Sequence, residues 1–219
     1  MEERISYKPV VKLTMLRLPF FIALLMIMVL ATAQQHPVTF FTKAEAYEVK
    51  KNLAAFPVLT QSYNEIKKEV DQYLGKDVDV PFPKDPAGGY THDKHKANYT
   101  LMFNSGVLYT ITGDTKYAGL VKEMLLKYAV LNPTLKNHPQ ATSTSPGRIF
   151  WQALNDANWM VYAGMAYDLI YTSLSIAERK KIEDGAFKPE VDYLTKDLKE
   201  WFDRLHNHSV WACAGVGII

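Results

Sequence analysis

The chain has 219 residues, of which 22% are charged and 48% hydrophobic, with a formal net charge of +2 at pH 7. That surplus lies in the first 33 residues, because residues 34–219 carry 21 basic and 21 acidic side chains. Nucleic-acid binding relies on clustered positive charge, so this balance argues against a nucleic-acid partner. The single cysteine, Cys213, excludes an internal disulfide and is expected to pack as a small hydrophobe.

The first 33 residues have the pattern of a secretory signal peptide. A basic lead-in is followed by an apolar run from Phe20 to Leu30 and by Ala31-Thr32-Ala33, which has the spacing of a cleavage site. The apolar run is shorter than the ~20 residues that a membrane-spanning helix needs. We therefore predict a cleaved signal over residues 1–33, a periplasmic or secreted mature protein and no membrane partner after cleavage.

Helical signals follow one another through the remaining chain, and no strand alternation persists. Thr42 is placed to cap a first helix, and Ser175 with Glu178 forms a capping box. A loop rich in Pro, Asp and Gly covers residues 76–91. The predicted helices cover about 42–53, 58–74, 92–112, 114–131, 147–171, a short segment from 175, 187–201 and 207 onward.

Two kinds of helix alternate along the chain. The segments 92–112, 147–171 and 207 onward are apolar on most sides and must be enclosed, whereas 114–131 and 175–201 carry one apolar stripe and cover them. Successive hairpins of this kind build a solenoid or a double-layered toroid, and the absence of a repeated sequence favours the toroid. The predicted fold class is all-α: an incomplete (α/α) toroid of helical hairpins over residues 34–219, interrupted in mid-helix at Ile219.

Polar side chains concentrate where the enclosed helices begin. If each enclosed helix follows a covering one, all enclosed helices run in the same direction and their N-termini gather at one end, where free N–H groups favour an anion. The side chains at the three starts are Tyr90, His92, Lys94 and His95; Arg148, Gln152 and Asn155; and His206, Asn207 and His208. We refer to this predicted anion site as the mouth.

Several of these residues also have a purely structural interpretation. Asn155 is equally explained as a helix cap, and Trp151 as a core residue or as a sugar-stacking face. His36 and His138 lie in loops and are expected to be solvated. His206 and His208 are two positions apart and diverge on a helix, whereas a zinc pair prefers a spacing of four, so no metal and no cofactor is expected.

The combination of an amide and an imidazole at an anion site is suited to acidic sugars. Cleavage of a 4-linked uronate by β-elimination removes the proton at C5, which becomes acidic only when the neighbouring carboxylate is neutralised. Asn207 can donate hydrogen bonds to that carboxylate without titrating, and His208 can join it or act as a base near neutral pH. Tyr90, His92, Gln152 and Asn155 are the candidate substrate-binding residues around this pair.

Three separated motifs carry a resemblance to a known family. Residues 84–99 (Lys-Asp-Pro-Ala-Gly-Gly-Tyr-Thr-His-Asp-Lys-His-Lys-Ala-Asn-Tyr), residues 146–155 and residues 206–211 resemble alginate and oligoalginate lyases of polysaccharide lyase family seventeen. The last motif is also similar to the Asn-His motif of heparinase II/III-like lyases. The resemblance implies that Asn207 and His208 neutralise the uronate carboxylate, and that a catalytic tyrosine and β-sandwich domains lie beyond Ile219, so the fragment alone is expected to be inactive.

Two other functions remain open at this point. One is a lyase that acts on heparin, heparan or another glycosaminoglycan, although the neutral charge of residues 34–219 disfavours sulfated chains. The other is a helical module that binds a polymer without cleaving it. The expected partner is alginate or a related anionic polysaccharide.

Overall fold

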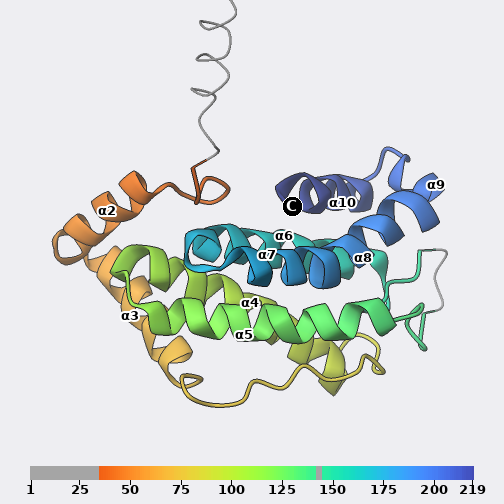
Figure 1. The fold of residues 1–219 in the computed structure, drawn as a ribbon, viewed down its shortest axis with the longest axis horizontal. Coiled ribbons are helices and arrows are strands. Elements are labelled where there is room, and N and C mark those ends of the chain that lie inside the picture. The colour runs from red at the N-terminus through yellow and green to blue at the C-terminus, as the bar shows by residue number, and fades with distance from the viewer. Residues whose placement is uncertain (1–34, 142–144) are drawn as a thin grey trace, which may run out of the picture. The chain divides into compact units, whose positions relative to one another are not determined.

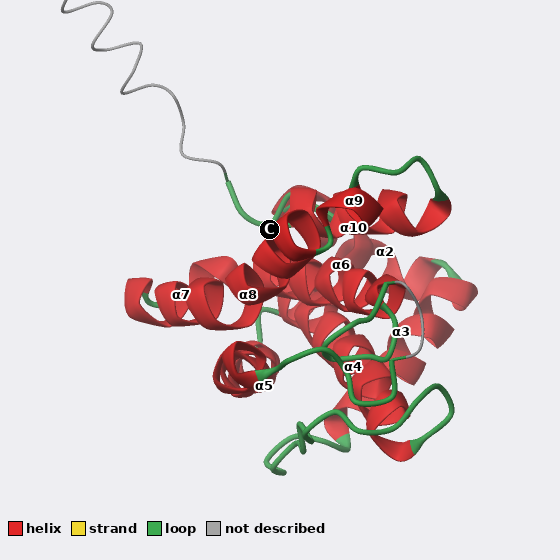
Figure 2. Cartoon of the chain, turned by 90° about the vertical axis from the view of Figure 1, so that its right-hand side faces the viewer, coloured by secondary structure: helices red, strands yellow, loops and turns green. Residues whose placement is uncertain are grey.

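The computed structural model describes residues 35–141 and 145–219, so the predicted signal peptide lies outside the described residues. Contacts divide the chain at Gln35, and the unit from His36 to Ile219 contains the helices discussed below. Among the described residues the secondary structure is helical, with no strand (Figures 1 and 2). The all-α prediction is confirmed.

The helices follow the predicted order, and local capping explains several of their ends. Thr42 and Glu45 form a capping box at the first helix, Asp114 caps α5, and Ser175 with Glu178 caps α7. Gly113 ends α4 with a φ of 77°, a left-handed conformation that favours glycine. The bounds are α2 Lys43–Asn52, α3 Pro57–Asp71, α4 Tyr90–Thr112, α5 Thr115–Leu131, α6 Ala153–Ile170, α7 Ile176–Ile182, α8 Lys188–Asp192, α9 Lys199–Phe202 and α10 Asn207–Ile218.

Helices α4, α6 and α10 run parallel to one another. Along the α4–α6 contact, Tyr99 stacks on Tyr162 with ring centroids 4.9 Å apart. Further along, the Thr110 hydroxyl oxygen lies 3.4 Å from the carbonyl oxygen of Leu169. Residue numbers therefore increase together along both helices. The same holds for α10 on α6, where Gly215 lies against Met160 and Ile218 lies against Gly164.

The covering helices run in the opposite direction. Tyr128 near the end of α5 is hydrogen-bonded at 2.8 Å to His95 near the start of α4. Glu183, early in the α7–α9 segment, meets Tyr167 near the end of α6. Figure 1 shows α5, α7 and α8 beside the inner helices. Inner and covering helices thus alternate in direction as predicted, and the N-termini of α4, α6 and α10 lie at one end.

Two helical segments differ from the prediction. The helix expected from Gly147 begins only at Ala153, because the carboxylate of Asp156 accepts the backbone N–H groups of Arg148 and Phe150 and holds residues 148–152 in bends. The segment 176–202 is nearly continuous and contains π-helical turns at Glu183–Phe187 and Tyr193–Asp197. Pro189 follows the first of these turns and has no N–H to donate, which fits a local change of hydrogen-bonding pattern.

The expected environments of three side chains were wrong. Cys213 is exposed on α10, which buries mainly its small residues against α6. His138 is buried, and its Nδ1 accepts the backbone N–H of Gln140 at 3.1 Å. His36 is half-buried: its ring stacks on Tyr171 with centroids 3.9 Å apart and its Nδ1 binds Asp168.

Asp168 fastens residues 36–39 to the C-terminal part of α6. Its second carboxylate oxygen accepts the backbone N–H groups of Val38 and Thr39, both at 2.8 Å, and the Thr39 hydroxyl at 2.7 Å. These hydrogen bonds hold the pKa of Asp168 below its ordinary value despite burial, which acts in the opposite direction. The carboxylate therefore joins segments about 130 residues apart in the chain.

Candidate functional site

The start of α10 is fixed by an imidazole that acts as the helix cap. His206 Nδ1 accepts the backbone N–H of Ser209 at 3.1 Å, and Nε2 lies 3.2 Å from the carbonyl oxygen of Trp201, to which it donates. In return, the Ser209 hydroxyl oxygen accepts the backbone N–H of His206, and the hydroxyl also lies within hydrogen-bond distance of the His206 carbonyl oxygen. This exchange satisfies the end of the helix without using the two side chains that follow.

Those two side chains are Asn207 and His208. Asn207 is exposed, and His208 is half-buried with its ring edge-on to His206 at a centroid distance of 5.6 Å. Neither side chain forms a hydrogen bond to any residue in the described part of the chain. An amide and an imidazole are thus held on an ordered helix start with their hydrogen-bonding groups free for a ligand.

The start of α6 lies next to the start of α10. Gly215 packs against Met160, and stepping back eight residues along each parallel helix leads to Asn207 and Gln152 respectively. Because both helices rise ~1.5 Å per residue, these two positions lie at the same level along the helix pair. The Gln152 and Asn155 side chains are half-buried and form no hydrogen bond within the described residues. The structure therefore places Gln152 and Asn155 at the same end of the α6–α10 pair as Asn207.

The start of α4 contributes less than predicted. His92 is buried and packs edge-on against Phe150, with centroids 5.0 Å apart, so it supports the loop before α6 and has little surface for a ligand. Burial also lowers the pKa of His92, which favours the neutral imidazole. His138 shows the same lowering of its pKa, caused by burial and by the neighbouring His92.

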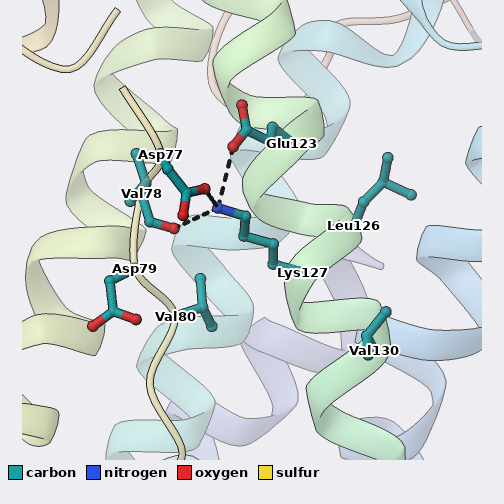
Figure 3. A pocket seen from close by; sticks show the side chains of 8 residues that line it. All are labelled: Asp77, Val78, Asp79, Val80, Glu123, Leu126, Lys127 and Val130. Carbon is teal, nitrogen blue, oxygen red and sulfur yellow. Dashed lines mark hydrogen bonds and ion pairs between the residues drawn. The ribbon is translucent and has the colours of Figure 1, made fainter. Parts of the chain in front are cut away.

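Tyr90 points away from the mouth. Two positions on a helix differ by roughly 200°, so Tyr90 and His92 project on opposite sides of α4. The Tyr90 hydroxyl donates to Asp79 at 3.2 Å. Asp79 lies in an outer groove between residues 77–80 and α5, where Lys127 binds Asp77, Glu123 and the Val78 carbonyl (Figure 3). The structure does not bring Tyr90 together with Gln152 and Asn207.

Arg148, which the sequence places at the mouth, is instead buried beneath it. Its guanidinium donates to the carbonyl oxygens of Asn132 at 2.6 Å, Leu135 at 2.8 Å and Pro189 at 2.8 Å, and lies 3.4 Å from Glu190. Together with Asp156, it fixes residues 147–152 and hence the position of Gln152. Sequence reasoning missed Glu190, which belongs to a covering helix 42 positions away.

Two buried carboxyl groups share this one guanidinium. Burial raises the pKa of Glu190 to about 7, and burial together with Glu190 raises the pKa of Asp156. Asp156 accepts two backbone N–H groups, whereas neither oxygen of Glu190 accepts a hydrogen bond in the described structure. We therefore assign the proton of the pair to Glu190 below about pH 7.

This assignment predicts how stability depends on pH. Between the ordinary pKa of 4.5 and about 7, the folded state holds a proton on Glu190 that the unfolded state has released, so the free energy of unfolding falls as pH rises through that window. Glu190→Gln imitates the protonated acid, so the free energy of unfolding of this variant should not decrease through that pH window. Relative to the unsubstituted chain, the variant should gain up to roughly 3 kcal/mol between pH 4.5 and 8, measured by urea unfolding. If the free energies of unfolding of the two proteins changed with pH in parallel, the assignment of the proton to Glu190 would be wrong.

A metal site and a membrane-spanning helix each place requirements on the described residues. Within the described residues, no group of three or more His, Cys, Asp or Glu side chains is arranged to hold a metal ion. None of the helices in the described part of the chain has the length and apolar character needed to cross a bilayer.

Comparison with known proteins gives a consistent result. Residues 41–219 match the family model described as "Alginate lyase". The chain is 39% identical over 201 residues to a protein named "Exo-oligoalginate lyase" from Saccharophagus degradans, covering 90% of this chain and 27% of that relative. It is 37% identical over 177 residues to an "Alginate lyase" from Stenotrophomonas maltophilia, covering 81% of this chain and 24% of that relative. The chain thus spans about a quarter of the length of these relatives.

Proposed function

Because this chain belongs to the alginate lyase family, we propose that the protein containing it cleaves alginate or its oligomers by β-elimination. In this proposal Asn207 and His208 neutralise the carboxylate of the uronate whose C5 proton is removed. The observation that carries the proposal is the amide and imidazole at the start of α10, which bind no other described residue, at the same end of the α6–α10 pair as Gln152 and Asn155.

The chemistry of this site follows from charge. Removing the C5 proton places a second negative charge next to the carboxylate, and donors already aimed at that group stabilise the developing dianion without reorganisation. The Asn207 amide stays neutral at any pH, so it donates throughout the reaction. The N-terminal N–H groups of α6 and α10 add positive potential at the same place.

The scheme also requires a group that protonates the leaving 4-oxygen. By the resemblance described above, that group is a tyrosine beyond Ile219. We further propose that the protein belongs to polysaccharide lyase family seventeen within the heparinase II/III-like lyases. In this proposal the inner and covering helices form part of a toroid, and residues 1–33 direct export to the periplasm or beyond.

The test uses the protein from its complete reading frame. Each cleavage by β-elimination leaves a C4–C5 double bond conjugated to the carboxylate, so product is followed by ultraviolet absorbance on alginate and, in parallel, on heparin. We expect absorbance to rise with alginate. A rise with heparin alone would assign the enzyme to glycosaminoglycans, and binding of polymer with no absorbance change would indicate a non-catalytic module.

A further inference from the structure

A second group of ligand-type side chains lies on α4 and α6, deeper than the mouth. This inner-face cluster consists of Lys96, Tyr99, Asn158 and Tyr162. Tyr99 stacks on Tyr162 with an interplanar angle of 18°, and Phe103 packs edge-on against Tyr162 at 5.6 Å. The two phenol rings are therefore fixed in place by aromatic packing between parallel helices.

The polar groups of the inner-face cluster lack hydrogen-bond partners among the described residues. Tyr99, Asn158 and Tyr162 are half-buried, and their hydroxyl and amide groups form no hydrogen bond to the described residues. Burial raises the pKa of Tyr99, which keeps its hydroxyl a donor at neutral pH. Because these groups are only half-buried and bind no other described side chain, they can donate to and accept from a ligand on this surface.

Lys96 adds an uncompensated charge to this surface. Lys116, Lys122 and Lys127 of the covering helix α5 are all paired with carboxylates. Lys96 is exposed and has no ion pair within the described residues. Lys96 and Tyr99 are three positions apart on α4, so both lie on the same side of that helix.

We propose that the inner-face cluster binds the uronate residue adjacent to the one held by Asn207 and His208. The inference rests on the proposed function. Lys96 pairs with the carboxylate of this second sugar, while the phenol hydroxyls and the Asn158 amide bind its ring hydroxyls. Asn158 and Tyr162 lie ~9 Å and ~15 Å beyond Gln152 along α6, so the surface continues inward from the mouth.

Calorimetric titration of the full chain tests this inference. The ligands are the monomer and the tetramer of mannuronate and, in parallel, the monomer and the tetramer of guluronate. The tetramer should bind more tightly than the monomer. Lys96→Gln should weaken tetramer binding about fivefold, an effect reduced by salt, and leave monomer binding unchanged. Tyr162→Phe keeps the aromatic packing, removes one hydroxyl and should also weaken only the tetramer. Lys68→Gln is the matched control, because it removes an exposed lysine of α3 that has no ion pair in the described part of the chain, and it should change the binding of neither ligand.

The outcomes separate this inference from the proposed function. Asn207→Ala should weaken the monomer and the tetramer alike, and a monomer affinity unchanged by that substitution would count against the carboxylate site itself. If Lys96→Gln weakened the binding of monomer and tetramer equally, Lys96 would belong to the mouth and the second subsite would be overturned. Tetramer affinity that is unaffected by Lys96→Gln and Tyr162→Phe, or no tighter than monomer affinity in the unsubstituted chain, would overturn it as well.

Discussion

Replacing Asn207 with alanine is expected to lower alginate turnover by the complete protein on the order of 100-fold, the usual loss when one preorganised donor to a developing anion is removed. The loss arises in the chemical step, because the amide interacts most strongly with the dianion. Steady-state kinetics should therefore show a lower kcat, with a smaller change in KM.

The fold offers a clean control for this substitution. Asn207 is exposed and does not cap α10, because His206 performs that role. Circular dichroism and the unfolding midpoint should therefore stay as they are. Asn64→Ala removes an exposed amide from α3 and should leave turnover intact. Unchanged turnover in Asn207→Ala would remove the amide from the mechanism, and a loss of helical content would make it a structural residue.

Replacing Arg148 with alanine is expected to lower the free energy of unfolding by about 3–5 kcal/mol, the usual cost of removing one partner from a buried ionic network. Three carbonyl oxygens lose their donor, and the buried Asp156 and Glu190 lose the positive charge beside them. Urea unfolding followed by circular dichroism at pH 7 measures the change.

An exposed ion pair supplies the comparison for Arg148. Lys180 and Asp184 are paired at 2.7 Å on the surface, and solvent screening makes such pairs weak. Lys180→Ala should therefore leave the urea midpoint almost unchanged. If both variants unfold at the same urea concentration as the original chain, the buried network does not hold the loop before α6.

The sequence predicted the features that depend on near neighbours. Capping at Thr42, Asp114 and Ser175 involves residues within a few positions, and the apolar periodicity distinguished inner from covering helices. The shared direction of the inner helices followed from that alternation, and with it the position of the starts of α6 and α10 at one end.

Long-range contacts account for what could not be predicted. Arg148 looked like a site residue because nothing near it in sequence reveals Glu190. His138 looked solvated because its burial depends on elements distant in the chain. The late start of α6 reflects a side chain, Asp156, that competes for the backbone N–H groups of the preceding residues. Tyr90 sits at the right position in sequence but on the wrong side of α4, which its bond to Asp79 reveals.

The attachment of residues 36–39 to Asp168 has a consequence for how the protein is made. Synthesis proceeds from the N-terminus, so this stretch emerges from the ribosome about 130 residues before its carboxylate partner. Until Asp168 has been synthesised, residues 36–39 lack this anchor. Docking of this segment therefore has to wait for the synthesis of α6, which ends at Ile170.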